Sequence, residues 1–251
     1  PDLYDQADAA GADRKSDENP WHTVTRWLIV INVAFFVIDA GLAIAGYGRA
    51  MVRHDGEPIV QQLSNGRLGL IGQPVLTSFG YFSVDLAIVG KQLWRFFTYQ
   101  FVHANVEHVL LNMVGLLLAG PLVESRMGRG RYLLFYLICG AAGPLAHIAL
   151  SMMGLMQMSL FTPLVGASAS IYGVLVAAAR IAPDEVVMLA VPPVDVKLKN
   201  FVLVMIGLSL AAVLWRWQNA GGHAAHLGGA VAGYFLSRRF AAGRNALAAG
   251  T

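Results

Sequence analysis

The sequence predicts an all-α membrane protein, a bundle of six transmembrane helices with a long interfacial loop after the first helix. Composition gives the first indication, because hydrophobic residues make up 56% of the chain and charged residues only 13%, about half the charged share of a soluble domain. The second indication is the clustering of the charges. It leaves neutral stretches of the roughly 20 residues that a helix needs to cross a bilayer.

Six stretches meet this length and together define one domain over residues 26–240. Residues 1–25 before it are polar and lack periodicity, which predicts a disordered cytoplasmic tail. Residues 241–251 after it predict a short cytoplasmic C-terminal tail. The six expected spans are 27–46, 106–123, 132–153, 166–182, 200–217 and 222–237.

Two connections between the spans are partly apolar but unsuited to crossing the bilayer. Residues 47–105 are rich in aromatic side chains, which favours an element that lies in the membrane interface. The run 186–191, ended by Pro192 and Pro193, is too short to cross and predicts an interfacial loop.

The distribution of Lys and Arg predicts the orientation of the spans. These residues concentrate in the N-terminal tail, in the second-to-third and fourth-to-fifth connections and in the C-terminal tail. All four segments share one side when the N-terminus is cytoplasmic, as the positive-inside rule requires. We therefore expect an integral multi-pass protein with both termini cytoplasmic. The short polar tail without a transit signal suits a prokaryotic inner membrane. The same loops account for the net charge of +3, and no basic stripe with interleaved aromatics indicates nucleic acid as a partner.

Polar side chains inside the predicted spans carry the functional information. Ser168, in the string GASAS, opens the fourth span, and His226, in AHLGG, lies early in the sixth. Such groups are costly in lipid and usually face a bundle interior or a wet cavity. A serine on one span and a histidine on another therefore suggest a nucleophile and its base, assembled within the bilayer.

Helical spacing gathers more polar groups near these two residues. His108 and Asn112 share a face of the second span at i and i+4, and Tyr172 shares a face of the fourth span with Ser168. The second, fourth and sixth spans all begin on the outer side when the N-terminus is inside. The three polar clusters, including the one around His226, are therefore expected near the same extracytoplasmic surface.

Small residues favour close packing of the fourth span on the sixth. Gly166 opens the fourth span, and Gly229 and Gly233 follow the histidine at GxxxG spacing, which allows two backbones to approach closely in lipid. A short serine needs this approach to come within about 2.6–3.2 Å of a histidine. The fourth span is also brief, so we expect Ser168 to lie below the membrane surface, reached by a water-filled cavity.

This combination of motifs resembles the rhomboid family of intramembrane serine proteases, over about residues 27–237. The family has a six-span core with a GxSx nucleophile motif on the short fourth span. Its AHxxGxxxG motif matches Ala225, His226, Gly229 and Gly233, and its HxxxxHxxxN motif matches His103, His108 and Asn112. Its Trp-Arg pair matches Trp94 and Arg95, and its ExxxG motif matches Glu124 and Gly128.

The resemblance implies a role for each matched residue. Ser168 would attack the scissile carbonyl, and His226 would act first as base and then as acid. The Ser168 backbone N–H, His108 and Asn112 would stabilise the oxyanion, and Tyr172 would pack against the His226 ring. This chemistry implies no metal and no cofactor. The implied partners are single- or multi-span membrane-protein substrates and the lipid bilayer, whereas the oligomeric state is not predicted.

Other matched positions have supporting roles in this interpretation. His103 is expected to hold water near the site, and Trp94 and Arg95 to brace the first loop. One position departs from the pattern, because the residue after the nucleophile is commonly Gly and here is Ala169. This difference leaves open a change in substrate access near the serine.

Several residues have alternative interpretations. Ser170 is a rival nucleophile, but it lies about 200° around the helix from Ser168. His223 is a rival base that we expect to face the loop before the sixth span. Glu124 is expected to be structural, and Cys139 to be a small buried hydrophobic residue.

Other functional classes fit the sequence less well. A zinc protease of the membrane needs HExxH and an aspartyl type needs GxGD, and the sequence has neither motif. A transporter would show interrupted helices at paired positions in two halves. The main alternative is a catalytically inactive rhomboid-like protein that binds transmembrane segments. Such relatives typically lack the serine or the histidine, and this chain has both.

Overall fold

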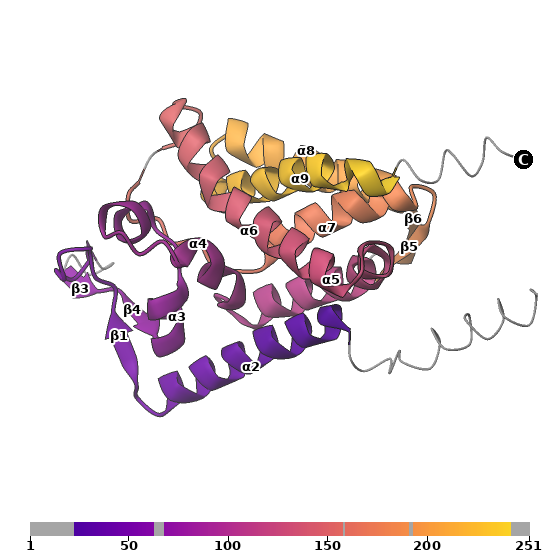
Figure 1. Ribbon diagram of the computed structural model, residues 1–251. Coiled ribbons are helices and arrows are strands. Elements are labelled where there is room, and N and C mark those ends of the chain that lie inside the picture. The colour runs from indigo at the N-terminus through magenta and orange to yellow at the C-terminus, as the bar shows by residue number, and fades with distance from the viewer. Residues whose placement is uncertain (1–22, 63–67, 158, 191–192, 242–251) are drawn as a thin grey trace, which may run out of the picture.

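The computed structural model describes residues 23–62, 68–157, 159–190 and 193–241 (Figure 1). Within these residues, long helices form a bundle, which confirms the predicted fold class. Three of them, α2, α5 and α6, are long and apolar enough to cross a membrane, and α7 and α8 are shorter apolar helices. The count of six spans therefore stays a prediction. The bundle helices are α2 (Val24–Ile44), α5 (Val106–Met127), α6 (Arg129–Met152), α7 (Ser168–Ile181), α8 (Leu198–Leu214) and α9 (Ala220–Ala241).

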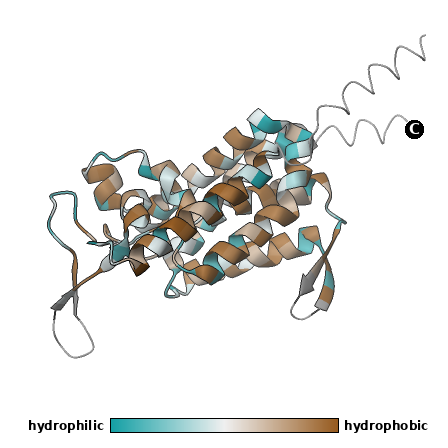
Figure 2. Ribbon diagram, turned by 90° about the horizontal axis from the view of Figure 1, so that it is seen from below, coloured by the Kyte–Doolittle hydropathy of each residue, from teal (hydrophilic) through white to brown (hydrophobic). Residues whose placement is uncertain are grey.

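Helix α7 lies at the centre of the bundle. It packs against α5, α6, α8 and α9, and nearly all of its residues are buried. The outer helices instead expose large apolar side chains, such as Leu111 on α5 and Leu203 on α8. Figure 2 shows hydrophobic residues along the whole length of the bundle helices. Exposed apolar faces of this kind are suited to contact with lipid rather than water.

The packing of α7 on α9 depends on glycine. A Cβ on Gly229 would collide with the backbone oxygen of Ala169, and a Cβ on Gly233 would lie 2.5 Å from the Cα of Gly173. The predicted close approach of these two helices is therefore confirmed. Gly228 allows the close approach of α9 to α6 instead, because a Cβ there would collide with the backbone oxygen of Ala142.

Helix α2 begins at a carboxylate from α5. The Glu124 side chain accepts hydrogen bonds from the backbone N–H of Val24 (2.7 Å) and of Thr25 (2.9 Å), and from the Thr25 hydroxyl (2.7 Å). These N–H groups have no partner within the helix, so the contact explains why α2 starts at Val24, inside the segment 1–25 that we expected to be tail. The expected structural role of Glu124 is confirmed. The rest of that tail and 242–251 lie outside the described residues.

A second carboxylate, Asp39 on α2, caps the short helix α3 (Val75–Gly80) in the same way. It accepts hydrogen bonds from the backbone N–H of Leu76 (2.7 Å) and of Thr77 (2.9 Å), and from the Thr77 hydroxyl (2.6 Å). Asp39 belongs to the first helix and its partners to the first loop, nearly forty residues further along the chain. These hydrogen bonds therefore attach the loop to the helix.

The first loop contains short elements that the sequence did not indicate. Its strands form two antiparallel two-stranded sheets, β1 (Gly48–Ala50) with β4 (Gly72–Pro74), and β2 (Val60–Gln62) with β3 (Leu68–Leu70). A π-helical turn (Asp85–Val89), helix α4 (Arg95–Thr98) and a 3₁₀ turn (Tyr99–Phe101) follow α3. These strands project from one end of the bundle, opposite the hairpin before α8 (Figure 1).

Arg95 holds the helical part of this loop together. Its guanidinium donates hydrogen bonds to the carbonyl oxygens of Tyr81 (2.6 Å) and Ser78 (3.2 Å) and to the side chain of Gln92 (2.7 Å). Trp94 is 55% exposed. We expected both members of the pair to brace the loop, and for Trp94 this role stays a prediction.

The connection before α8 is a β-hairpin. Strands β5 (Val186–Ala190) and β6 (Pro193–Lys197) pair antiparallel, a pairing that our expectation of an interfacial loop did not include. Apolar and β-branched residues on both sides of the prolines favour paired strands, and Pro192 itself lies outside the described residues. At the base of the hairpin, Lys199 (2.9 Å) and Lys197 (3.3 Å) donate to Asp184. These two hydrogen bonds hold the pKa of the exposed Asp184 carboxyl below its ordinary value.

Candidate active site

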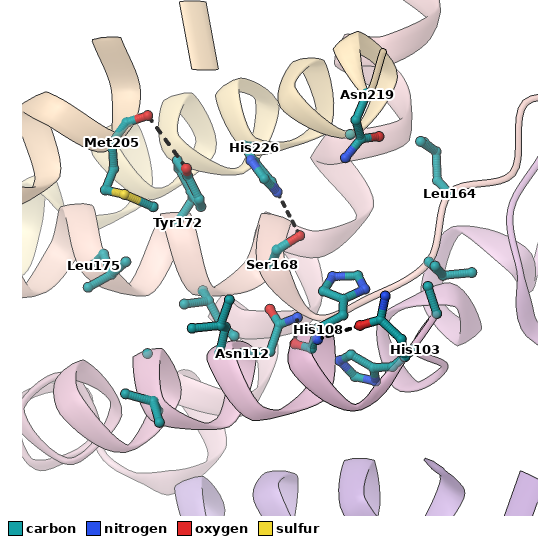
Figure 3. Close-up of a pocket in the computed structure, with 18 of the residues that line it drawn as sticks. His103, His108, Asn112, Leu164, Ser168, Tyr172, Leu175, Met205, Asn219 and His226 are labelled. Carbon is teal, nitrogen blue, oxygen red and sulfur yellow. Dashed lines mark hydrogen bonds between the residues drawn. The ribbon is translucent and has the colours of Figure 1, made fainter. Parts of the chain in front are cut away.

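A cavity of about 1150 Å³ opens between α5, α7, α8 and α9. Its lining includes His108 and Asn112 from α5, Ser168 and Tyr172 from α7, and His226 from α9. Figure 3 shows these side chains converging on one space. The structure therefore brings together the polar groups that the sequence placed near one membrane surface.

Ser168 and His226 are in direct contact. The Ser168 Oγ lies 2.8 Å from the His226 Nε2 (Figure 3), although 58 residues separate them in the chain. Ser168 is the first residue of α7, so its backbone N–H belongs to the first turn, whose amides have no intrahelical partner. A hydroxyl that hydrogen-bonds to an imidazole is the arrangement of a nucleophile and its general base.

Two aromatic rings flank the imidazole of His226. The Tyr172 ring stacks on it, with centroids 4.3 Å apart and planes at 15°. The His223 ring meets it edge-on, with centroids 5.4 Å apart. The His226 Nδ1 has no hydrogen-bond partner among the residues that the structure describes. Within those residues, the Ser168 contact and the two neighbouring rings therefore orient the imidazole.

Gly166 brings His108 close to the nucleophile. Its φ of +108° lies in the region that favours glycine, and a Cβ there would come within 2.6 Å of the His108 Nε2. The Asn112 Nδ2 would be 3.6 Å from that Cβ, and it donates one hydrogen bond to the His108 carbonyl oxygen at 2.8 Å. An amide nitrogen carries two hydrogens, so a second donor remains on Asn112.

His103 extends the polar lining beyond His108. The two rings meet edge-on, with centroids 5.2 Å apart. His103 is buried, and neither of its ring nitrogens has a hydrogen-bond partner in the described part of the chain. Buried polar atoms of this kind are commonly satisfied by water. The role of His103 in holding water stays a prediction.

The two rival residues have other contacts. Ser170 is fully buried and donates a hydrogen bond to the Gln100 Oε1 at 2.7 Å, so its hydroxyl joins α7 to the first loop. The His223 Nδ1 lies 3.2 Å from the Ser209 Oγ on α8. Our expectation that His223 faces the loop was wrong, because the side chain turns towards α8.

The methyl group of Ala169 points away from the cavity. Ala169 is buried, and a Cβ on Gly143 of α6 would come within 2.8 Å of its Cβ. The absent side chain of Gly143 thus makes room for the methyl group. Ala169 is also not among the residues that line the cavity.

Sequence reasoning missed the segment that leads to the nucleophile. Phe82 of the first loop and Leu164 pair as an isolated β-bridge, with N–H to oxygen distances of 3.0 and 2.8 Å. Leu164 lines the cavity, as does Asn219 just before α9 (Figure 3). The pairing of Phe82 with Leu164 has no sequence signal, because a bridge between single residues about eighty positions apart leaves no periodic pattern.

The fold and the site define a helical membrane protein with a serine–histidine pair in a cavity of its bundle. The Rhomboid domain family matches residues 90–242, more than half of the chain. The chain therefore belongs to the rhomboid family and is an integral membrane protein. Members of this family are typically intramembrane serine proteases, although some are inactive.

Relatives from bacteria, plants and animals match parts of this chain. RHOMBOID-like protein 1 of Arabidopsis thaliana is 28% identical over 158 residues, which cover 62% of this chain and 38% of that protein. Rhomboid protease GluP of Bacillus subtilis is 28% identical over 169 residues, 67% of this chain and 30% of that protein. Rhomboid-related protein 3 of Homo sapiens is 38% identical over 81 residues, 32% of this chain and 18% of that protein. The chain thus covers well under two thirds of the length of these relatives.

Proposed function

We propose that this chain is an intramembrane serine endopeptidase that cleaves the transmembrane segments of membrane proteins with a Ser168–His226 dyad. The observation that carries the proposal is the 2.8 Å contact between the Ser168 Oγ and the His226 Nε2, inside a cavity that polar groups from α5 also line. Membership of a family with a named protease, GluP, supports the same reaction.

The reaction proceeds in two stages. The Ser168 Oγ attacks the scissile carbonyl carbon while its proton moves to the His226 Nε2. The tetrahedral intermediate collapses, the carbon–nitrogen bond breaks, and His226 gives the proton to the leaving amine. Water then adds to the acyl-serine with His226 as base. The ester bond breaks, which releases the carboxylate product and restores the Ser168 hydroxyl.

The oxyanion forms where donors from two helices meet. The Ser168 backbone N–H lies at the positive end of α7, which favours a negative charge. The His108 ring, beside Gly166, and the free amide hydrogen of Asn112 supply the side-chain donors. Each preorganised donor of this kind contributes roughly 2.7–4 kcal/mol to transition-state stabilisation.

The substrate reaches this site from the membrane. The cavity is lined on one side by apolar residues of α5, such as Leu111 and Leu118, and on the other by Phe201 and Met205 of α8. This lining suits a transmembrane segment that enters sideways between α5 and α8. We further propose that both termini are cytoplasmic, in a prokaryotic inner membrane, so that the site lies near the outer surface.

A cleavage assay tests the proposal. The purified protein in lipid is incubated with a fluorescently tagged single-span substrate, beside Ser168→Ala and His226→Ala. Cleavage is expected for the wild type and to be abolished in both variants. Ser125→Ala is the matched control, because the exposed Ser125 hydroxyl bonds only to its own helix, and full activity is expected. Full activity of Ser168→Ala would refute the dyad. Binding of the substrate without cleavage by the wild type would favour the inactive alternative.

A further inference from the structure

The imidazole of His226 needs to be held in place for base catalysis. In a serine triad a third group on the other ring nitrogen holds the base. Here the His226 Nδ1 has no hydrogen-bond partner among the described residues. Apart from the Ser168 hydroxyl, the ring is flanked by the stacked Tyr172, at 4.3 Å between centroids, and by the edge-on His223, at 5.4 Å.

Both flanking rings are attached to the same hydroxyl group. The Ser209 Oγ lies 3.1 Å from the Tyr172 hydroxyl and 3.2 Å from the His223 Nδ1. A serine hydroxyl donates one hydrogen bond and accepts two, so it can satisfy both partners at once. The three residues come from three helices, Tyr172 from α7, Ser209 from α8 and His223 from α9.

Ser209 is an unusual residue for its position. It is fully buried, and it is the single polar side chain of α8 after Asn200. An alanine would fill nearly the same space without the cost of burying a hydroxyl group. The two hydrogen bonds therefore distinguish Ser209 from a residue that only fills space between helices.

We propose that Ser209 is a positioning residue, which holds the rings of Tyr172 and His223 against His226 and so makes the orientation of the base depend on the position of α8. This inference rests on the proposed protease function. Helix α8 also lines the cavity through Phe201 and Met205, on the side where a transmembrane substrate would enter. A movement of α8 would thus act on the base through the Ser209 hydroxyl, and more weakly through the Met205 backbone oxygen, which lies 3.5 Å from the Tyr172 hydroxyl.

Two rate measurements on Ser209→Ala test this proposal. The first is the rate at which a small fluorophosphonate probe labels Ser168, which depends on the activated serine but not on the passage of a transmembrane segment. The second is kcat and KM for a single-span substrate. We expect the labelling rate and kcat to fall together by at least about tenfold, because the substitution removes two hydrogen bonds, each of which gives up to about tenfold. KM should change by less than about twofold.

Ser237→Ala is the matched control. Ser237 is a fully buried serine on α9 whose hydroxyl bonds to the backbone of its own helix, at 3.3 Å from the Tyr234 oxygen, and wild-type rates are expected. Tyr172→Phe keeps the stacked ring and removes the hydrogen bond to Ser209 from the other side, together with the 3.5 Å contact with the Met205 oxygen. It carries the test if Ser209→Ala does not fold. The double variant should lose less than the sum of the two single losses, because the two changes share the Tyr172–Ser209 contact.

The outcomes separate this proposal from the proposed function. If the labelling rate and kcat of Ser209→Ala equal those of the wild type, the positioning role of Ser209 is overturned. A raised KM with unchanged labelling would also overturn it, because Ser209 would then act on substrate access alone. A wild-type protein that is neither labelled at Ser168 nor active would instead refute the protease function.

Discussion

The backbone oxygen of Ala169 occupies the place where a side chain on Gly229 would have to stand. This contact sets the separation of α7 and α9 next to the Ser168–His226 pair, because Ser168 directly precedes Ala169 and His226 lies one turn before Gly229. The 2.8 Å distance from the Ser168 Oγ to the His226 Nε2 thus depends on a residue without a side chain.

Gly229→Val is expected to push the two helices apart and to lower kcat by about 100-fold, the loss that a displacement of about 1 Å produces at a catalytic contact. It should also lower the free energy of unfolding by about 1–3 kcal/mol, because the site is already fully packed. Cleavage assays and thermal unfolding measure both quantities. Gly207→Val on α8 is the control, since open space surrounds that glycine. Wild-type activity in Gly229→Val would contradict the role of this contact.

Gly166→Ala tests the loop that precedes the nucleophile. The substitution strains a φ of +108° and drives a methyl group into the His108 ring, so turnover should fall at least tenfold with little change in KM. Gly154→Ala separates the two causes, because Gly154 also has a positive φ (+73°) but no atom within 4 Å of an added Cβ. It should cost about 1 kcal/mol in stability and retain activity. Equal activity of the two variants would argue against the His108 contact.

Glu124→Gln tests the carboxylate that caps α2. The amide keeps the shape but loses part of the capacity to accept three hydrogen bonds, so the free energy of unfolding should fall by about 1–3 kcal/mol. Activity below the unfolding temperature should stay close to that of the wild type, because Glu124 does not line the cavity. The control is Glu107→Gln, an exposed carboxylate on the same helix. Equal stability of the two variants would remove Glu124 from this role.

Ala169→Gly tests the direction of the methyl group beside the nucleophile. Since the methyl group faces Gly143 rather than the cavity, the cleavage position and the preference among substrates should not change. The stability should fall by about 0.5–1 kcal/mol, the usual cost of glycine in a helix. Mass spectrometry of the products locates the cut, and a shifted cut would show that the methyl group shapes substrate access.

The sequence was most informative where function depends on local spacing. Helical periodicity brought His108 and Asn112 to one face, and the glycines after His226 indicated close packing on α7. The sequence was least informative for contacts between segments that are far apart in the chain. Glu124 caps a helix that begins a hundred residues earlier, and Ser209 joins rings on two other helices. Neither leaves a periodic pattern. The β5–β6 hairpin was missed because a short apolar run suits both a strand and a loop at a membrane surface.

Identification of the serine that reacts with a fluorophosphonate tests the central claim most directly. The labelled protein is digested and the modified residue is located by mass spectrometry, in the wild type, His226→Ala and Ser168→Ala. The account predicts modification of Ser168 in the wild type, much slower modification in His226→Ala and none in Ser168→Ala. A folded wild-type protein labelled at Ser170, or labelled at Ser168 equally fast without His226, would contradict it.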